Sequence, residues 1–228
     1  VDNRQSLHFK QLFDSIKFFE FNNLYHEHIS YGTLNDSDGN PFKTRDGGTK
    51  PLSELFEETY QYIKNINSNL EDSTIKQLAN SVLTFSDLIT NRKTDYKFDL
   101  EKFTNVNGKT GLYVQYAQVR AKKLKQSIGL QKNEFDLLVL SDIDKQLLSL
   151  LFMFGYYLEQ SSSLNEPHHL ANYLYDISNS FNQFYEHEKL SEIKDSNHLN
   201  SKLYLIDLFL TTSKNVMFCL GIKPVERM

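Results

Sequence analysis

The chain has 228 residues, of which 39% are hydrophobic and 24% charged, and its formal net charge is −4. This composition suits a soluble globular protein of one large or two small domains. It excludes a protein that is basic overall, so a nucleic-acid partner would need a local basic patch. The single cysteine, Cys219, excludes an internal disulfide and argues against a cysteine-based zinc site. No apolar run approaches the roughly 20 residues that span a bilayer, and we expect a cytoplasmic protein with no membrane partner.

The first part of the chain predicts alternating strands and helices. In chain order the expected elements are a strand end at 1–3, an amphipathic helix at 6–19, a strand at 25–34, a turn at 35–41 and a helix capped by Ser53. This order is typical of an α/β unit. Because the chain opens with Val1 and its first methionine is Met153, we expect a fragment of a longer protein, with a processed terminus as the alternative.

The remainder predicts helices alone, so the expected fold is mainly α, with an incomplete α/β piece followed by an all-helical region. Helical spacing of apolar residues covers 73–89, 111–127, 141–160, 167–187 and 199–220. The expected breaks are a turn at Asn107-Gly108, a serine linker at 161–163, a helix start at Pro167 and a helix stop at Gly221. We divide the chain into 1–70, 71–108 and 109–228, although 73–103 fits either side of the first boundary.

The loop GNPFKTRDGGTKP (39–51) combines glycines, prolines and basic residues. Its three cations, Lys43, Arg45 and Lys50, face one carboxylate, Asp46, which leaves a local charge of +2. Gly47-Gly48 allows the close backbone approach that a phosphate site needs. The spacing is not that of a Walker loop, and composition alone favours a solvated turn over a phosphate site.

Histidine pairs are weak candidates for metal ligands. His26 and His28 lie two apart on a predicted strand and share a face, whereas His168-His169 point in different directions on a predicted helix. No third ligand lies at a recognisable spacing, so we expect structural or surface histidines and no metal site. The polar stretch DNRQSLH follows a predicted strand end, where α/β proteins bind ligands, but a helix N-cap explains it equally well.

The stretch GLYVQYAQVRAKKLKQ places Tyr113, Tyr116 and Arg120 on one helical face, with three lysines following. Rings that stack on unpaired bases, together with cations that neutralise phosphate, suit an RNA contact. The pattern alone favours the alternative, an amphipathic helix whose tyrosines are half in the core. On the helix predicted at 167–187 an apolar stripe reads as core, while three tyrosines are core rims or contacts: Tyr173, Tyr175 and Tyr185. No nucleophile–histidine–acid set is visible in the sequence.

Seven stretches occur in an order that is shared with one enzyme family. They are DNRQSLHFKQLF, EHISYG, GNPFKTRDGGT, NRKTDYKFD, YVQYAQVR, PHHLANYLYDISNSFNQFYEH and LGIKPVERM. Together they resemble arginyl-tRNA synthetase of bacterial type, a class I aminoacyl-tRNA synthetase, over essentially the whole chain. No single stretch is decisive, but the ordered set is specific.

For the first part of the chain, the resemblance implies the end of a Rossmann-type catalytic domain. It implies arginine binding by Gln5 and His8. It assigns the border of the adenosine pocket to three residues: His28, Ile29 and Gly32. It also makes the loop at 39–49 a degenerate counterpart of the KMSKS loop, with Thr44 in place of the usual second lysine and Lys43 and Arg45 as the catalytic cations that contact phosphate.

For the helical part, the resemblance implies the anticodon-binding domain that is named after its DALR sequence. The residues implied to face the anticodon loop are Tyr113, Tyr116, Arg120 and Met228. The parent enzyme is then expected to join arginine to arginine tRNA with ATP and Mg²⁺, as a monomer. Since no HIGH-type signature and no first half of the nucleotide-binding fold are found, we expect the chain alone to be inactive. A non-catalytic RNA-binding module and a helical interaction domain are the alternatives.

Overall fold

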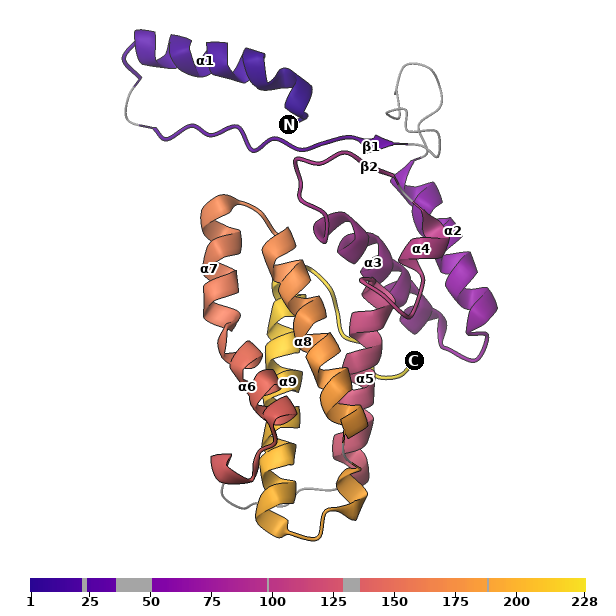
Figure 1. Ribbon diagram of the computed structural model, residues 1–228. Helices are drawn as coiled ribbons and strands as arrows, with labels where there is room; N and C mark the ends of the chain where they lie inside the picture. Colours follow the sequence, from indigo (N-terminus) through magenta and orange to yellow (C-terminus); the bar gives the residue numbers. More distant parts are fainter. Residues whose placement is uncertain (22–23, 36–50, 98, 129–135, 188) are drawn as a thin grey trace.

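The computed structural model describes residues 1–21, 24–35, 51–97, 99–128, 136–187 and 189–228. It confirms a mainly α fold (Figure 1). Within these residues the regular strands are β1 (Leu34–Asn35) and β2 (Tyr96–Lys97), which pair in parallel. None of the described helices is both long enough and apolar enough to cross a bilayer.

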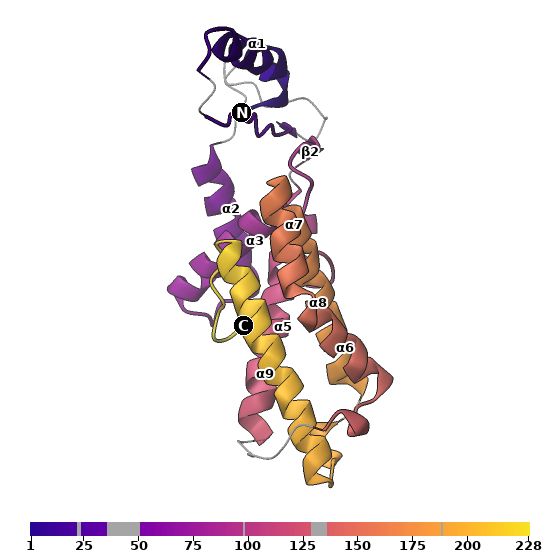
Figure 2. The same ribbon diagram turned by 90° about the vertical axis from the view of Figure 1, so that its left-hand side faces the viewer.

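The expected helix at 6–19 is present as α1 (Ser6–Phe18), which follows a 3₁₀ turn, η1 (Asn3–Gln5). Figures 1 and 2 show α1 standing apart from the other helices. No residue of α1 is buried, and Leu7 and Phe18 are 68% and 80% exposed. The amphipathic pattern therefore predicted the helix correctly, although Leu7 and Phe18 stay largely exposed among the residues described.

The strand expected at 25–34 is wrong as a continuous element. The segment is extended, but it forms only a parallel bridge between Tyr31 and Asp2 and the two-residue pairing of β1 with β2. The bridge consists of Asn3 N donating to Tyr31 O at 2.9 Å and Tyr31 N donating to Val1 O at 3.2 Å. It agrees with the strand end expected at 1–3. Strand ladders need continuous neighbours, and here each neighbour supplies only a few backbone groups.

Two helices connect the N-terminal part to the bundle: α2 (Leu52–Ile66) and α3 (Asp72–Leu88). Helix α2 packs on α3, and α3 packs on α5. The N-cap of α2 is Pro51, which has an extended backbone, and not Ser53, which lies two residues later in the first turn. After β2 in the chain, the short helix α4 (Leu100–Phe103) is capped by the side chain of Asp99, which accepts a hydrogen bond from Lys102 N.

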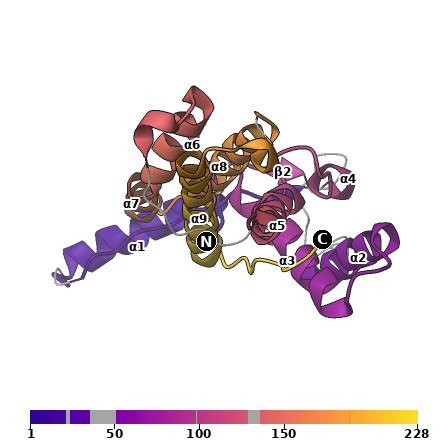
Figure 3. The ribbon, with the colours of Figure 1, turned by 90° about the horizontal axis from the view of Figure 1, so that it is seen from below.

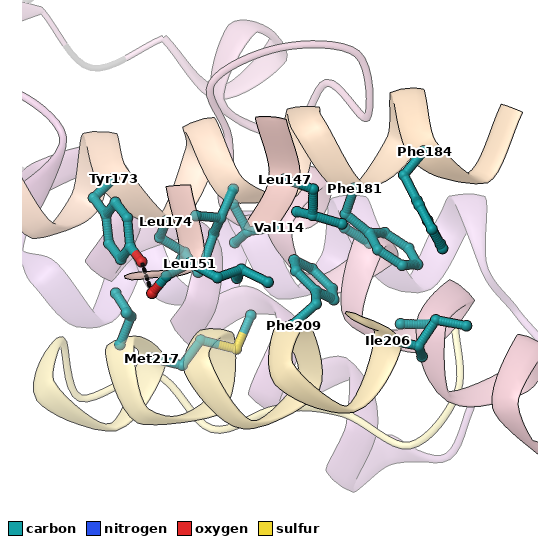
Figure 4. Close-up of a cluster of buried hydrophobic side chains, with 14 of the residues drawn as sticks. Val114, Leu147, Leu151, Tyr173, Leu174, Phe181, Phe184, Ile206, Phe209 and Met217 are labelled. Carbon is teal, nitrogen blue, oxygen red and sulfur yellow. Dashed lines mark hydrogen bonds between the residues drawn. The ribbon is translucent and has the colours of Figure 1, made fainter. Parts of the chain in front are cut away.

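Among the residues described, five helices form the C-terminal bundle. They are α5 (Gly111–Ile128), α6 (Asp142–Phe152), α7 (Phe154–Leu164), α8 (His168–His187) and α9 (Ser196–Cys219), with 3₁₀ turns η3 (Leu137–Val139) and η4 (Leu190–Glu192) between them. Helices α5, α8 and α9 lie side by side along the long axis (Figures 1 and 3). Their core is aromatic in the middle, where the rings of Phe181 and Phe209 stack with centroids 4.2 Å apart (Figure 4).

One expected break in the bundle is misplaced, and one break was not expected. The helix predicted at 141–160 is divided at Met153, and the serines predicted to form a linker lie inside α7. Ser161 is buried there because its hydroxyl accepts a hydrogen bond from Leu170 N in the first turn of α8, at 3.1 Å. Helix α7 ends instead at Asn165, which has a left-handed backbone (φ 52°). The helix stop at Gly221, with φ 72°, is confirmed.

Candidate functional site

A pocket of about 330 Å³ opens where α5, α8 and the C-terminal tail meet. It is lined by Tyr116, Val119, Arg120, Lys123, Leu124, Ser127, Tyr185 and Met228. Three of the four residues that the resemblance assigns to an RNA contact thus come together here. We call this site the Arg120 pocket.

The guanidinium of Arg120 lies between two tyrosine rings. Its central carbon is 4.5 Å from the ring centroid of Tyr116 and 4.5 Å from that of Tyr185. The same group donates to Tyr116 Oη at 2.9 Å through Nη2 and to Asn182 Oδ1 at 2.9 Å through Nη1. Each cation–π contact is worth about 0.5–2 kcal/mol, depending on how far it is desolvated. The planar cation is therefore held in place before any ligand binds.

Both rings keep a face or edge in solvent, since Tyr116 is 40% and Tyr185 is 39% exposed. Lys123 adds a second cation to the lining. Glu186 approaches Arg120 at 3.8 Å, but its side chain is 73% exposed, so this pair is weak. The pocket thus offers flat aromatic and guanidinium surfaces beside positive charge, which suits a planar ring that is attached to an anionic chain.

Tyr113 does not line the Arg120 pocket. Its hydroxyl donates to Asn179 Oδ1 at 3.2 Å, and its ring contacts that of Tyr175 with centroids 5.3 Å apart. Lys109 Nζ in turn lies over the ring of Tyr175, 5.1 Å from its centroid. Tyr113 therefore belongs to a separate α5–α8 contact, and its predicted role in RNA binding stays a prediction.

Tyr185 and Asn182 are the residues that the sequence did not single out for this site. Asn182 lies 62 residues from Arg120 in the chain, and Tyr185 had been left open as a core rim or a contact. The only signal in the sequence was their spacing of three on α8, which puts both on one helical face. Nothing local says that this face meets Arg120.

The residues assigned to arginine binding, Gln5 and His8, both lie exposed at the start of α1. Gln5 is the N-cap of α1 but makes no side-chain cap bond, and the ring of His8 meets that of Phe9 edge to face at 5.6 Å. The N-cap explanation holds for Asp2, whose carboxylate accepts from Arg4 N at 2.8 Å. Hydrogen bonds from the Arg4 side chain and backbone lower the pKa of Asp2 to about 2.

His26 and His28 share a face, as the alternation predicts. His28 stacks on Phe9 with centroids 4.5 Å apart, and His26 stacks on Phe13 at 5.7 Å. Both rings therefore cover one side of α1. Ile29 is 44% exposed. The roles of His28 and Ile29 at an adenosine pocket stay predictions.

Gly32 packs directly against the loop that follows α3. Its N–H donates to Arg92 O at 2.6 Å, and a Cβ atom at this position would overlap the backbone of Thr94. The Arg92 side chain donates to Ser30 O and, through Nε, to Asn165 O at 2.8 Å. The side chain of Arg92 thus joins the segment at 27–33 to the α7–α8 turn, and we call these contacts the Arg92 joint.

Beside the Arg92 joint, His168 and His169 do not point apart as expected, because their ring centroids are 4.1 Å apart at the start of α8. With Glu166 they place possible ligand atoms within 4.8 Å of one another. Lys93 Nζ already lies 3.0 Å from Glu166 Oε1, and its hydrogen bond lowers the pKa of Glu166. The other carboxylate oxygen, Oε2, lies 3.5 Å from His169 Nε2 and 4.0 Å from His168 Nδ1, so the Glu166 carboxylate lies between the lysine and the two rings.

The loop that carries Lys43 and Arg45, the predicted catalytic cations, lies outside the residues that the structure describes. Its assignment therefore stays a prediction.

Comparison with known proteins identifies two family domains in the chain. Residues 114–228 match the DALR anticodon binding domain, and residues 1–100 match the catalytic domain of class I tRNA synthetases (R). Among curated proteins, the arginine–tRNA ligase of Alcanivorax borkumensis is 36% identical over 240 residues, covering 100% of this chain and 41% of the relative. That of Francisella tularensis subsp. novicida is 34% identical over 239 residues, again with 100% and 41% coverage.

Solved structures share the fold. Arginyl-tRNA synthetase from Thermus thermophilus superposes with a TM-score of 0.78 at 23% identity, over 88% of this chain and 35% of that one. The Plasmodium falciparum enzyme gives 0.78 at 24% identity, over 100% and 40%. The chain spans about two fifths of the length of the curated relatives that it matches. It belongs to the arginyl-tRNA synthetase family, and its C-terminal bundle is a DALR anticodon binding domain.

Proposed function

We propose that the helical bundle of this chain binds the anticodon loop of an arginine tRNA at the Arg120 pocket. The observation that carries the proposal is the guanidinium of Arg120, which is held between the half-exposed rings of Tyr116 and Tyr185. An unstacked base finds a stacking surface on either ring, and the adjacent phosphates find Arg120 and Lys123. The family of the domain and the names of the curated relatives support the choice of tRNA.

Variants of the pocket test the proposal. Tyr185→Ala removes one stacking surface, and base–aromatic stacking is worth about 1–3 kcal/mol per base, so we expect affinity for an arginine tRNA transcript to fall about tenfold or more. Arg120→Ala removes the cation and loosens both rings, with a similar loss. Fluorescence anisotropy at low salt measures both. The matched controls are an exposed tyrosine on α7, Tyr156→Ala, and an exposed lysine on α9, Lys214→Ala.

The alternatives predict different results. If both variants bind as well as the unmodified chain does, the pocket is the wrong face. If the unmodified chain binds no tRNA at low salt, a helical protein-interaction domain becomes the better explanation.

The enzyme that includes this chain is proposed to join arginine to its tRNA, with MgATP as the second substrate. The arginine carboxylate attacks the α-phosphate, pyrophosphate leaves, and the terminal ribose of the tRNA then takes the arginyl group from the adenylate. The side chains would act by positioning and charge stabilisation. Gln5 and His8 are proposed for arginine. Adenosine is assigned to His28, Ile29 and Gly32, and the leaving pyrophosphate to Lys43 and Arg45.

This chain alone is proposed to lack catalysis. Gln5 and His8 are exposed and His28 is only half-buried, so these three described residues lie on an open surface. Arginine-dependent ATP–pyrophosphate exchange in the presence of tRNA measures the activity. Turnover by the isolated chain above a no-enzyme blank would contradict the proposal.

A further inference from the structure

The C-terminal tail, residues 221–228, returns from α9 across α5 toward α3 (Figure 3). It has no regular secondary structure, yet Ile222 and Val225 are 3% and 1% exposed. Met228, at its end, is half-buried and lines the Arg120 pocket. The tail therefore supplies part of a binding site without a helix or strand of its own to place it there.

One buried side chain holds the backbone of the tail. Gln115, in the second turn of α5, is 0% exposed. Its Nε2 donates to Lys223 O at 2.8 Å, and its Oε1 accepts from Val225 N at 3.0 Å. Nε2 donates its second hydrogen to Ser81 Oγ of α3, also at 2.8 Å. A single amide thus ties α5, α3 and two backbone groups of the tail together.

The remaining polar side-chain contacts of the tail are more exposed. Lys122 Nζ reaches Val225 O at 3.2 Å and Glu226 Oε1 at 2.8 Å, and the Glu226 side chain is 82% exposed. Arg227 pairs with Glu71 at 2.5 Å, but both side chains are more than half exposed. Exposed ion pairs add little and weaken with salt. The Gln115 amide is therefore the main polar anchor of the tail.

We propose that Gln115 is a positioning residue of the Arg120 pocket, which fixes the tail so that Met228 forms one wall of the site. Met228 is the third residue after Val225, so a fixed Val225 confines Met228 to within roughly 10 Å. Without the amide, Lys223 O and Val225 N lose their buried partner and the tail detaches. The part of the proposal that concerns RNA rests on the function proposed above, whereas the part that concerns the tail does not.

The chain offers a matched control one turn along the same helix. Gln118 is 1% exposed, and its Nε2 donates to Leu210 O at 3.1 Å and to Ser213 Oγ at 2.8 Å of α9. No hydrogen bond of Gln118 goes to the tail. Gln118→Met and Gln115→Met therefore each remove a buried amide of α5, but only the second removes the anchor of the tail.

The experiment compares both variants in the full chain by hydrogen exchange and by tRNA binding. Gln115→Met is expected to speed exchange in a peptide that covers 221–228 by about tenfold, which corresponds to 1.4 kcal/mol. It is also expected to weaken binding of an arginine tRNA transcript. Gln118→Met is expected to leave both the tail and the affinity unchanged. Equal exchange of the tail in the two variants would overturn the proposal.

A surface variant keeps the test decisive if Gln115→Met folds poorly. Met228→Ala, which removes a half-buried side chain at the end of the tail, should weaken tRNA binding without changing the bundle. Combined with Gln115→Met it should add little, because both changes remove the same wall. Fully additive losses would overturn the proposed link between Gln115 and Met228. If the unmodified chain binds no tRNA, the proposed function fails, and exchange of the tail alone then decides the role of Gln115.

Discussion

Lys202 and Asp144 form an ion pair inside the bundle, and their side chains are only 1% and 0% exposed. Lys202 Nζ reaches both oxygens of Asp144, at 2.8 and 2.7 Å, and lies 5.3 Å from the ring centroid of Phe184. Asp144 also closes a capping box with Ser141 at the start of α6. The pair therefore fixes α9 against the first turn of α6.

Breaking this pair on one side is expected to destabilise the fold strongly. Lys202→Met leaves a buried carboxylate without its cation and should lower the free energy of unfolding by about 3–5 kcal/mol. Urea denaturation followed by circular dichroism measures the change. An exposed neighbour on α6, Lys145→Met, is the control and should stay within about 0.5 kcal/mol. A loss below about 1 kcal/mol for Lys202→Met would contradict the cost expected for a buried carboxylate without its cation.

Helices α3 and α5 are in close backbone contact at Gly111, the first residue of α5. A Cβ atom at this position would overlap the carbonyl of Ser81 and crowd Val82 N, which are backbone atoms of α3. Backbone cannot rotate away as a side chain can. The glycine is thus required by the packing of two helices and not by the conformation of its own residue.

Gly111→Ala is expected to force α3 and α5 apart and to cost about 1–3 kcal/mol, the usual range for an overpacked contact. Gly155→Ala in α7 is the matched control, because a Cβ there meets nothing within 4 Å. Alanine is the better helix former, so this control should be neutral or up to about 1 kcal/mol more stable. Thermal unfolding of both variants gives the comparison. Equal melting temperatures would argue against the close contact.

The N-terminal part and the bundle meet at the Arg92 joint. Asn165 strengthens it, since its Nδ2 donates to Glu27 Oε2 at 3.0 Å while its own carbonyl accepts from Arg92. The joint lies at the start of α8, and the Arg120 pocket lies near the end of the same helix through Tyr185. One helix therefore connects the part of the chain that matches the catalytic domain to the part that matches the anticodon binding domain.

Removing the joint is expected to loosen the N-terminal part without unfolding the bundle. Arg92→Ala deletes the donors to Ser30 O and Asn165 O, so exchange of amides at 27–33 should rise about tenfold, while that of α8 and α9 stays unchanged. Hydrogen exchange by mass spectrometry resolves the two regions. Lys93→Ala, which removes only a half-exposed ion pair at the same joint, is the control. Faster exchange throughout the bundle would mean that Arg92 supports the core instead.

Local sequence was sufficient for most of the helices, because the spacing of apolar residues along a helix is a property of that segment alone. The spacing of apolar residues located α1, α3, α5, α8 and α9, and Gly221 ended the last one as expected. The strand at 25–34 was lost because a strand depends on neighbours that its own residues do not specify. The serines at 161–163 were misread for the same reason, since Ser161 is stabilised by an amide of α8 and not by its own turn.

The binding residues also fall into those that local sequence indicates and those that only the tertiary structure brings together. The tyrosines and the arginine of α5 were visible as one helical face, and the ordered stretches pointed to the right family. The sandwich of Arg120 needed Tyr185 and Asn182, and the wall of its pocket needed the tail that Gln115 holds. These partners lie 62 to 110 residues away in the chain. Periodicity reports which face of a helix is apolar or polar, whereas the pairing of two distant faces follows from how the side chains of the whole core fill space.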